Sequence, residues 1–393
     1  MLKEKVCATI DELSERLIAV STEIHSNPEL NFKEFKASKL LAEKLTEENF
    51  KVELGVANLD TAIRAEHPEQ KNGPTIAILA EYDALPEVGH GCGHNLIATA
   101  ALGAALGLGR IKKELAGKLL FLGTPAEEGG GGKVLMLNAG LFKNVDAAMM
   151  FHPSGIYTDT GVKGLAMTEV KIEFFGQTAH AASDPENGIN ALDAVIQTFN
   201  GINALRQHIT SDARIHGIIT DGGIKPNIVP DYAAASFYIR ALNNDYCETL
   251  IKKVENCAKG AAFSTGADMK FERIEPSYQS RNMNKTMGKA FLENLKLINE
   301  PLRPIPKGMN FGSSDIGNIS QIVPTIHPYV AISEKPIPGH SKEFAKAAIS
   351  EKGQNAMLAA AKGLAMTAID LFTNPEMMRE VQEEFKNSIA EKE

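Results

Sequence analysis

The chain has 393 residues, of which 44% are hydrophobic and 23% charged, a composition typical of a globular protein without extensive disorder. Its 41 basic and 49 acidic residues give a net charge of −8, which argues against nucleic acid or an anionic membrane as the main partner, because both favour a clustered basic surface. Four cysteines are too few for a disulfide scaffold, so a reducing, cytoplasmic location is expected. No segment is predicted to be a signal peptide or a membrane span.

The first 50 residues predict helices, since apolar residues such as Ile10, Leu13 and Leu17 recur at helical spacing. Short apolar runs further along predict strands, and a helix over 96–108 separates the first two of them. Strands that alternate with helices are typical of a largely parallel sheet covered by helices on both faces. The predicted strands are 75–80, 118–123, 147–151 and 329–332.

The pattern changes at about residue 169, where the order becomes strand, helix, strand, strand, helix, strand. This is the order of the split βαβ, or ferredoxin-like, sandwich. We therefore predict a mixed α/β domain with a mostly parallel sheet, built from 1–168 and 277–393, and an α+β domain inserted into it at 169–276. The six inserted segments are 170–175, 188–208, 214–220, 232–240, 245–262 and 269–274.

Polar residues that can bind ligands follow the predicted strands of the first domain. In open α/β sheets, ligands bind outside the carboxyl ends of the strands, so side chains at these positions are expected to share one site. In chain order they are Asp83, the pair Glu127 and Glu128, His152, and His340 in a later loop.

The densest motif is His90-Gly91-Cys92-Gly93-His94-Asn95, which places two imidazoles and a thiol within five residues. Glycine allows the backbone turns that aim alternate side chains at one point. Thiolate and imidazole suit zinc and other late divalent ions. Any one of these residues alone would be read as ordinary packing, but the three together favour a metal site.

The adjacent acids Glu127 and Glu128 lie between an apolar run and four glycines, in Thr124-Pro125-Ala126-Glu127-Glu128-Gly129. An exposed pair of glutamates is common and is the alternative reading. Within a site, one carboxylate can bind a metal while its neighbour acts as a general base.

The two remaining histidines complete a candidate ligand set. Taken singly, His152 reads as a core or capped histidine and His340 as an exposed loop residue. Two metals about 3.5–4 Å apart with a shared ligand need about five or six protein ligands. The chain supplies five: Cys92, His94, Glu128, His152 and His340.

The inserted domain offers three further candidates. His180 follows a strand, Asn227 lies between two strands, and Arg240 ends one. A loop histidine, a turn-forming asparagine and a surface charge are equally good readings of these residues. Together they could polarise a carbonyl and pair with a carboxylate.

These motifs, in this order, resemble the M20 family of metallopeptidases, and most of all its branch of aminobenzoyl-glutamate hydrolases and aminoacylase-like dipeptidases. The likeness spans about residues 20 to 365. It is carried by the segment from Ile24 to Leu30, Glu81-x-Asp83-Ala84-Leu85-Pro86, the His90–Asn95 motif, Pro125–Glu128, His152-Pro153, Gly176-x-x-Ala179-His180-Ala181 and Pro338-Gly339-His340-Ser341.

The resemblance implies a role for each matched residue. Cys92 would bridge two metal ions in place of the aspartate used elsewhere in the family, with His94 and His152 completing one ion's ligands and Glu128 and His340 the other's. Glu127 would be the general base and Asp83 would support the ligands. From a lid domain, His180 would stabilise the oxyanion, and Arg240 would meet a substrate carboxylate. Asn227 would also come from the lid, which could reach across a dimer.

The chain departs from the family pattern at two positions, and the second bears on the substrate. Much of the family has His where this chain has Glu81, so the site is expected to rely on His94. Asn95, where related amidohydrolases usually carry aspartate, and the segment 312–317 are more similar to the aminobenzoyl-glutamate and β-alanyl dipeptide branch. Ser313 and Ser314 of that segment are predicted to bind substrate. This branch implies N-acyl amino acids or small dipeptides, not long peptides.

We therefore expect a metal-dependent amide hydrolase with two divalent ions, zinc first and manganese, cobalt or nickel as alternatives, and a homodimer formed through the inserted domain. Two other hypotheses stay open. Cys92 could be a nucleophile activated by His90 or His94. The fold could also hold a structural zinc or a ligand without turnover.

Overall fold

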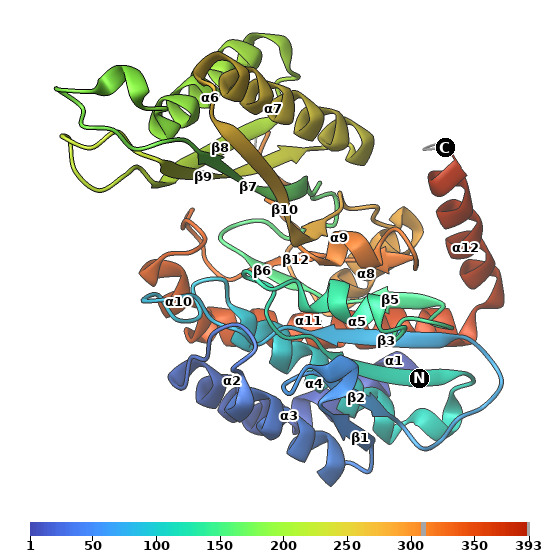
Figure 1. The fold of residues 1–393 in the computed structure, drawn as a ribbon. Helices are drawn as coiled ribbons and strands as arrows, with labels where there is room; N and C mark the ends of the chain where they lie inside the picture. Colours follow the sequence, from blue (N-terminus) through green and yellow to red (C-terminus); the bar gives the residue numbers. More distant parts are fainter. Residues whose placement is uncertain (308–311, 391–393) are drawn as a thin grey trace. The chain divides into compact units, whose positions relative to one another are not determined.

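The computed structural model describes residues 1–307 and 312–390 (Figure 1). The chain forms two compact units: unit 1 is Met1–Val162 with Arg281–Glu393, and unit 2 is Lys163–Ser280. Unit 2 extends a few residues beyond the predicted inserted segment, 169–276, at both ends.

Unit 1 contains a six-stranded sheet in the order β1-β2-β4-β3-β5-β11. The neighbours from β4 to β11 are parallel, whereas β1 and β2 add an antiparallel edge. The predicted class, a mixed and mostly parallel sheet with helices, is confirmed. The strands are β1 (Lys51–Leu54), β2 (Ile63–Glu66), β3 (Thr75–Ala80), β4 (Lys118–Gly123), β5 (Ala147–Met149) and β11 (Thr325–Ile326).

The buried strands β3 and β4 have the predicted bounds. A strand covered on both faces is apolar along its whole length, so an apolar run such as Ile76–Ala80 marks where the strand lies. The last predicted strand differs. β12 (Tyr329–Ala331) does not join the main sheet but pairs in parallel with β6 (His152–Ser154) in a separate two-stranded sheet. His152 therefore begins a strand, where the apolar run of 147–151 suggests that it follows one.

Helix α4 (His94–Arg110) begins at a predicted ligand and is buried almost throughout. Its small residues let neighbouring helices approach closely: a Cβ at Gly103 would lie 2.9 Å from Leu17, and one at Gly107 would lie 2.9 Å from Ile10. The other helices of unit 1 are α1 (Leu2–Glu12), α2 (Ser14–Ser26), α3 (Phe35–Glu47), α5 (Gly132–Asn138), α8 (Lys285–Leu297), α9 (Ile316–Ile319), α10 (Lys342–Ala348), α11 (Glu351–Thr373) and α12 (Pro375–Ala390).

One helix, α11, is long and apolar enough to cross a membrane by length and composition. However, 78% of its most apolar stretch is buried inside the protein, where it packs against α4, α8 and α1. A buried core helix satisfies the same criteria, so this is weak evidence for a span.

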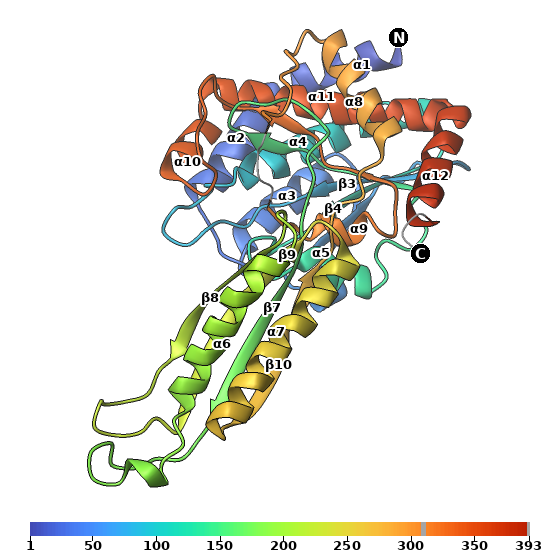
Figure 2. The ribbon, with the colours of Figure 1, turned by 90° about the horizontal axis from the view of Figure 1, so that it is seen from above.

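Unit 2 is a four-stranded antiparallel sheet in the order β10-β7-β9-β8, with α6 and α7 packed together against one face (Figure 2). Apolar residues such as Ile172, Phe237 and Ile239 alternate along the strands and form its own core with the helices. The predicted βαββαβ order is confirmed. The elements are β7 (Ala166–Phe175), α6 (Ala191–Leu205), β8 (Arg214–Asp221), β9 (Tyr232–Ala241), α7 (Asn244–Thr265) and β10 (Asp268–Tyr278).

Candidate metal centre

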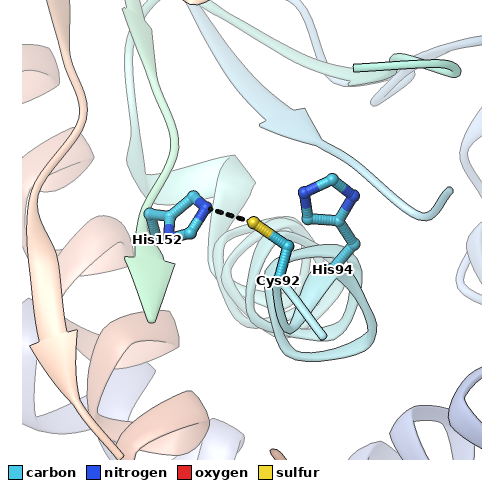
Figure 3. A group of neighbouring side chains, drawn as sticks. All are labelled: Cys92, His94 and His152. Carbon is cyan, nitrogen blue, oxygen red and sulfur yellow. Dashed lines mark hydrogen bonds between the residues drawn. The ribbon is translucent and has the colours of Figure 1, made fainter. Parts of the chain in front are cut away.

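The five predicted ligands lie together in unit 1, in two overlapping sets. Cys92, His94 and His152 place one donor atom each within 4.8 Å of one another (Figure 3). Cys92, Glu128 and His340 do the same. The Sγ atom of Cys92 lies 3.4 Å from Nε2 of His152 and 3.7 Å from Nε2 of His340. Cys92 is thus common to both sets, which are the sets that the resemblance implies.

Gly93 allows this convergence. Its φ is +77°, and a Cβ there would lie 2.6 Å from Pro153. The missing side chain lets the His152-Pro153 segment pack directly against the turn that carries Cys92 and His94.

His94 is oriented by a buried carboxylate. Its Nδ1 lies 3.0 Å from Oδ1 of Asp83, while Asp83 Oδ2 accepts a hydrogen bond from the Glu128 amide at 2.9 Å. Nε2 of His94 is buried without a hydrogen-bond partner, as is Oε1 of Glu128. Nε2 of His94 and Oε1 of Glu128 are thus two unpaired electron-pair donors beside the Cys92 thiol, a set that fits a divalent cation. A carboxylate that hydrogen-bonds the other ring nitrogen, as Asp83 does here, is the usual support for a histidine ligand.

His152 has the matching arrangement on the other side of Cys92. Its Nδ1 lies 2.7 Å from the carbonyl oxygen of Pro153, to which it donates in the neutral tautomer. Burial lowers the pKa of His152 to about 3, so the ring is neutral and its Nε2 lone pair faces the thiol. Neutral imidazole is the form that binds metal.

The alternative role of Cys92 as a nucleophile is less well supported. Burial raises the pKa of the Cys92 thiol well above its usual value, and the Glu128 carboxylate adds to the shift. A nucleophilic cysteine needs the opposite, a lowered pKa. His90, one of its proposed activators, points elsewhere, since its Nε2 lies 3.1 Å from the carbonyl oxygen of Ile24 in α2.

Glu127 and Glu128 follow a strained turn that is held by Glu34. Ala126 has φ +57°, and its amide donates to Oε1 of Glu34 at 2.9 Å. The fully buried Glu34 also accepts from the hydroxyl of Thr61 at 2.7 Å. Glu34 therefore fixes the backbone immediately before the predicted base. The sequence analysis did not identify it, because one glutamate at the start of a helix has no distinguishing pattern.

Glu127 lies in an acidic setting and is mostly enclosed, with 12% of its side chain exposed. One of its oxygens is within 4.8 Å of donor atoms of His94 and Glu128, and it also groups with Glu81 and Asp315. Burial, followed by the neighbouring carboxylates, raises the pKa of Glu127 well above its usual range. A carboxylate shifted in this direction suits proton transfer near neutral pH.

Glu81, which stands where much of the family has histidine, belongs to a buried ion network. The Lys133 ammonium contacts Glu81 and lies 2.7 Å from Oδ1 of Asp315, and all three side chains are at most 1% exposed. Although burial opposes it, the two carboxylates raise the pKa of Lys133. Glu81 is therefore neutralised by Lys133, which the sequence analysis did not identify.

The remaining predicted residues of unit 1 are Ser313 and Ser314, which lie just before α9. The Ser314 hydroxyl oxygen accepts a weak hydrogen bond from the Ile316 amide at 3.4 Å. The Ser313 hydroxyl is buried without a hydrogen-bond partner. Their predicted contact with substrate stays a prediction.

The predicted residues of unit 2 lie at opposite ends of its sheet. His180 and Asn227 are exposed and adjacent, with the Ala181 amide donating to the Asn227 carbonyl at 3.1 Å. They follow the end of β7, whereas Arg240 pairs with Met167 near its start. The structure thus brings His180 and Asn227 together and separates both from Arg240.

A thiol, imidazoles and carboxylates gathered at the carboxyl edge of a parallel sheet, with a further glutamate beside them, are the arrangement of a metal-dependent hydrolase. The chain belongs to peptidase family M20/M25/M40, whose sequence profile matches residues 77–362.

Individual relatives extend this comparison. The chain is 39% identical to an Xaa-Arg dipeptidase of Mus musculus over 405 residues, which cover 100% of this chain and 94% of the relative. It is 35% identical over 309 residues to one of the subunits of p-aminobenzoyl-glutamate hydrolase from Escherichia coli, covering 73% of this chain and 63% of that relative.

Solved structures share the fold at low identity. An aminobenzoyl-glutamate utilization protein from Klebsiella pneumoniae matches with a TM-score of 0.73 at 19% identity, covering 93% of this chain and 98% of that one. A dinuclear metal-binding M20 peptidase from Bacillus subtilis matches with a TM-score of 0.67 at 21% identity, covering 92% and 99%.

The support of His94 can be tested through Asp83. Asp83→Asn keeps the shape of the side chain but removes the charge that stabilises the imidazole, so metal affinity is expected to fall roughly 10- to 100-fold. Competition with a chromophoric chelator measures this, with the exposed Asp60→Asn as control. Unchanged affinity in Asp83→Asn would show that His94 needs no carboxylate behind it.

Proposed function

We propose that this protein is a two-metal hydrolase that cleaves the amide bond of small dipeptides or N-acyl amino acids. The observation that carries the proposal is the pair of donor sets that share Cys92, with Glu127 beside them. Cys92, His94 and His152 would hold one divalent ion, and Cys92, Glu128 and His340 the other. Zinc suits a site with a thiolate best, with manganese, cobalt or nickel as alternatives.

Two ions held there would supply Lewis acidity, activating water and polarising the scissile carbonyl. Glu127 would then take a proton from the attacking water and deliver it to the leaving amine. Its burial and its raised pKa support this role. Asp83, through His94, would keep one ligand in place.

The relatives support a small substrate with a free carboxylate. Their names specify an Xaa-Arg dipeptide in one case and p-aminobenzoyl-glutamate in the other, and both molecules end in an amino acid joined through an amide. We extend that substrate class to this chain. Ser313, with its unpartnered hydroxyl, would contribute to binding together with Ser314.

The test is a hydrolysis screen of Xaa-Arg dipeptides, β-alanyl dipeptides, aminobenzoyl-glutamate and N-acetyl amino acids. We expect turnover of at least one class, loss of turnover on chelation, and recovery with added zinc or manganese. Activity that resists chelators and is destroyed by thiol alkylation would support the Cys92 nucleophile instead. Metal bound without any hydrolysis would support the non-catalytic alternative.

We also propose that unit 2 acts from a neighbouring protomer. His180 and Arg240 are separated along one sheet by about eight residues, or roughly 26 Å, which is too far for both to contact one small substrate from a single copy of unit 2. A homodimer would let His180 and Asn227 of one protomer and Arg240 of the other serve the same site. The four cysteines are free, in keeping with the proposed cytoplasmic location.

The edge strand β8 is the candidate dimer contact. An edge strand presents unpaired backbone groups that can pair with a second copy, and on β8 Ile218 and Ile219 are 67% and 45% exposed. Ile218→Lys is expected to convert the dimer into monomers, as measured by sedimentation velocity. Phe263→Lys is the control, since Phe263 is 93% exposed on α7, away from this edge. A monomeric parent protein would contradict the proposal.

A further inference from the structure

The loop between α2 and α3 packs against both segments of unit 1 that carry the proposed catalytic groups. Toward the first segment, the Glu29 carbonyl accepts a hydrogen bond from the Ala84 amide at 2.8 Å. Toward the second, Phe32 covers the glycines that follow the two glutamates, since a Cβ at Gly130 would clash with its ring. Side chains of this loop can therefore hold the two segments in a fixed relation to each other.

Asn31 joins the two segments through its amide. In the orientation that pairs both ends of the amide, its nitrogen donates to Oδ2 of Asp83 at 3.0 Å and its oxygen accepts from the Gly129 amide at 3.3 Å. The same Oδ2 accepts from the Glu128 amide, and Oδ1 of Asp83 lies 3.0 Å from Nδ1 of His94. Asp83 is only 1% exposed, so Asn31 helps to fix the direction of a buried carboxylate.

Glu34 ends the loop and holds the backbone on both of its sides. Its Oε1 accepts from the amides of Phe32 and Ala126, each at 2.9 Å, and its Oε2 accepts from the Thr61 hydroxyl at 2.7 Å. Phe32 and Ala126 have φ values of +60° and +57°, in the left-handed region that non-glycine residues rarely adopt. Such a backbone persists only where its surroundings hold it, and here one carboxylate oxygen pairs with both strained amides.

We infer that Asn31 and Glu34 are positioning residues of the hydrolytic site. The inference rests on the proposed function and gives the two residues separate tasks. Asn31 holds the carboxylate behind His94 and so acts on metal binding. Glu34 holds the backbone before Glu127 and so acts on proton transfer. Displacements of this kind are costly, because a shift of about 1 Å in a reacting group can lower a rate 10²-fold.

Asn31→Ala is expected to weaken metal binding roughly 10-fold, the lower end of what residues that orient a ligand contribute. Competition with a chromophoric chelator measures the affinity. Asn27→Ala is the matched control, because the Asn27 side chain also makes hydrogen bonds at the start of this loop, but with Glu23 and Lys36. It should lose thermal stability in the same way and keep the parent affinity.

A double-mutant cycle shows whether Asn31 acts through Asp83. If it does, the double variant Asn31→Ala/Asp83→Asn should bind metal no more weakly than Asp83→Asn alone. Losses that add in the double variant, or the parent affinity in Asn31→Ala, would overturn this role. The cycle measures metal and not turnover, so it applies even if no compound of the screen is hydrolysed, a result that would contradict the proposed function and the role of Glu34 only.

Two conservative variants test Glu34. Glu34→Gln should keep most of the parent kcat, because its amide oxygen can still accept from both strained amides while Thr61 rotates to accept from its nitrogen. Glu34→Asp keeps the charge but is one methylene shorter, so it should lower kcat roughly 10- to 100-fold with KM little affected. Steady-state kinetics on the metal-loaded protein measures both. Parent kcat in Glu34→Asp, or equal losses in the two variants, would overturn the role of Glu34.

Discussion

Glu127→Gln is expected to retain both metal ions and to lose turnover by roughly 10²- to 10⁴-fold, the usual contribution of a general base. Glutamine has nearly the same shape as glutamate but cannot accept the proton from the attacking water. Because Glu127 is not one of the five proposed ligands, metal content by elemental analysis should stay at the parent value. The change should appear in kcat, with KM little affected, since substrate binding does not depend on the proton acceptor.

The exposed Glu87→Gln is the matched control for this variant and should have full activity. Glu127→Gln with near-parent kcat would remove Glu127 from the role of base and direct attention to Glu81, which lies in the same acidic group. Loss of metal in Glu127→Gln would instead make it a ligand.

Two substitutions of Cys92 have the second largest expected effect. Cys92→Ala should lose both metal ions and all measurable activity, because its sulfur is the one donor common to the two sets. Cys92→Asp should recover binding of both ions and part of the activity, since aspartate occupies this bridging position elsewhere in the family. A carboxylate can contact two cations but cannot replace a thiolate nucleophile in the same reaction. Elemental analysis measures the bound metal in both variants, and steady-state kinetics measures their kcat.

This pair of variants decides between the two catalytic hypotheses. If Cys92 were a nucleophile, Cys92→Asp would be as inactive as Cys92→Ala regardless of its metal content. Cys257→Ala is the control, since Cys257 is a free cysteine of unit 2 and belongs to no donor set in the described part of the chain.

Local sequence patterns were sufficient where neighbouring residues carried the information. Continuous apolar runs predicted β3 and β4 with the observed bounds, and alternating segments predicted the order of unit 2. The Cys92–His94 motif and the Glu127–Glu128 pair were identified as ligand-capable for the same reason, because each places unusual side chains a few residues apart.

Edge and short strands were harder to predict. β1 is mostly exposed and β2 is buried only at alternate residues, and both have mixed polarity, so no apolar run marks them. β6 is three residues long and contains a proline. β12 pairs with β6 and not with the main sheet, and the two strands are more than 170 residues apart in the chain. The periodicity of apolar residues carries no information about pairing between such distant segments.

The sequence by itself determined the fold class, the family and the chemical types of the candidate ligands, because these follow from local patterns and from motifs in a fixed order. Only the tertiary structure decided which side chains meet. It placed Lys133 against Glu81 and Asp315, Glu34 beneath the turn before Glu127, and Asn31 against Asp83. Each of these residues is ordinary among its own neighbours in the chain, and its burial and charge environment arise only when distant segments pack together.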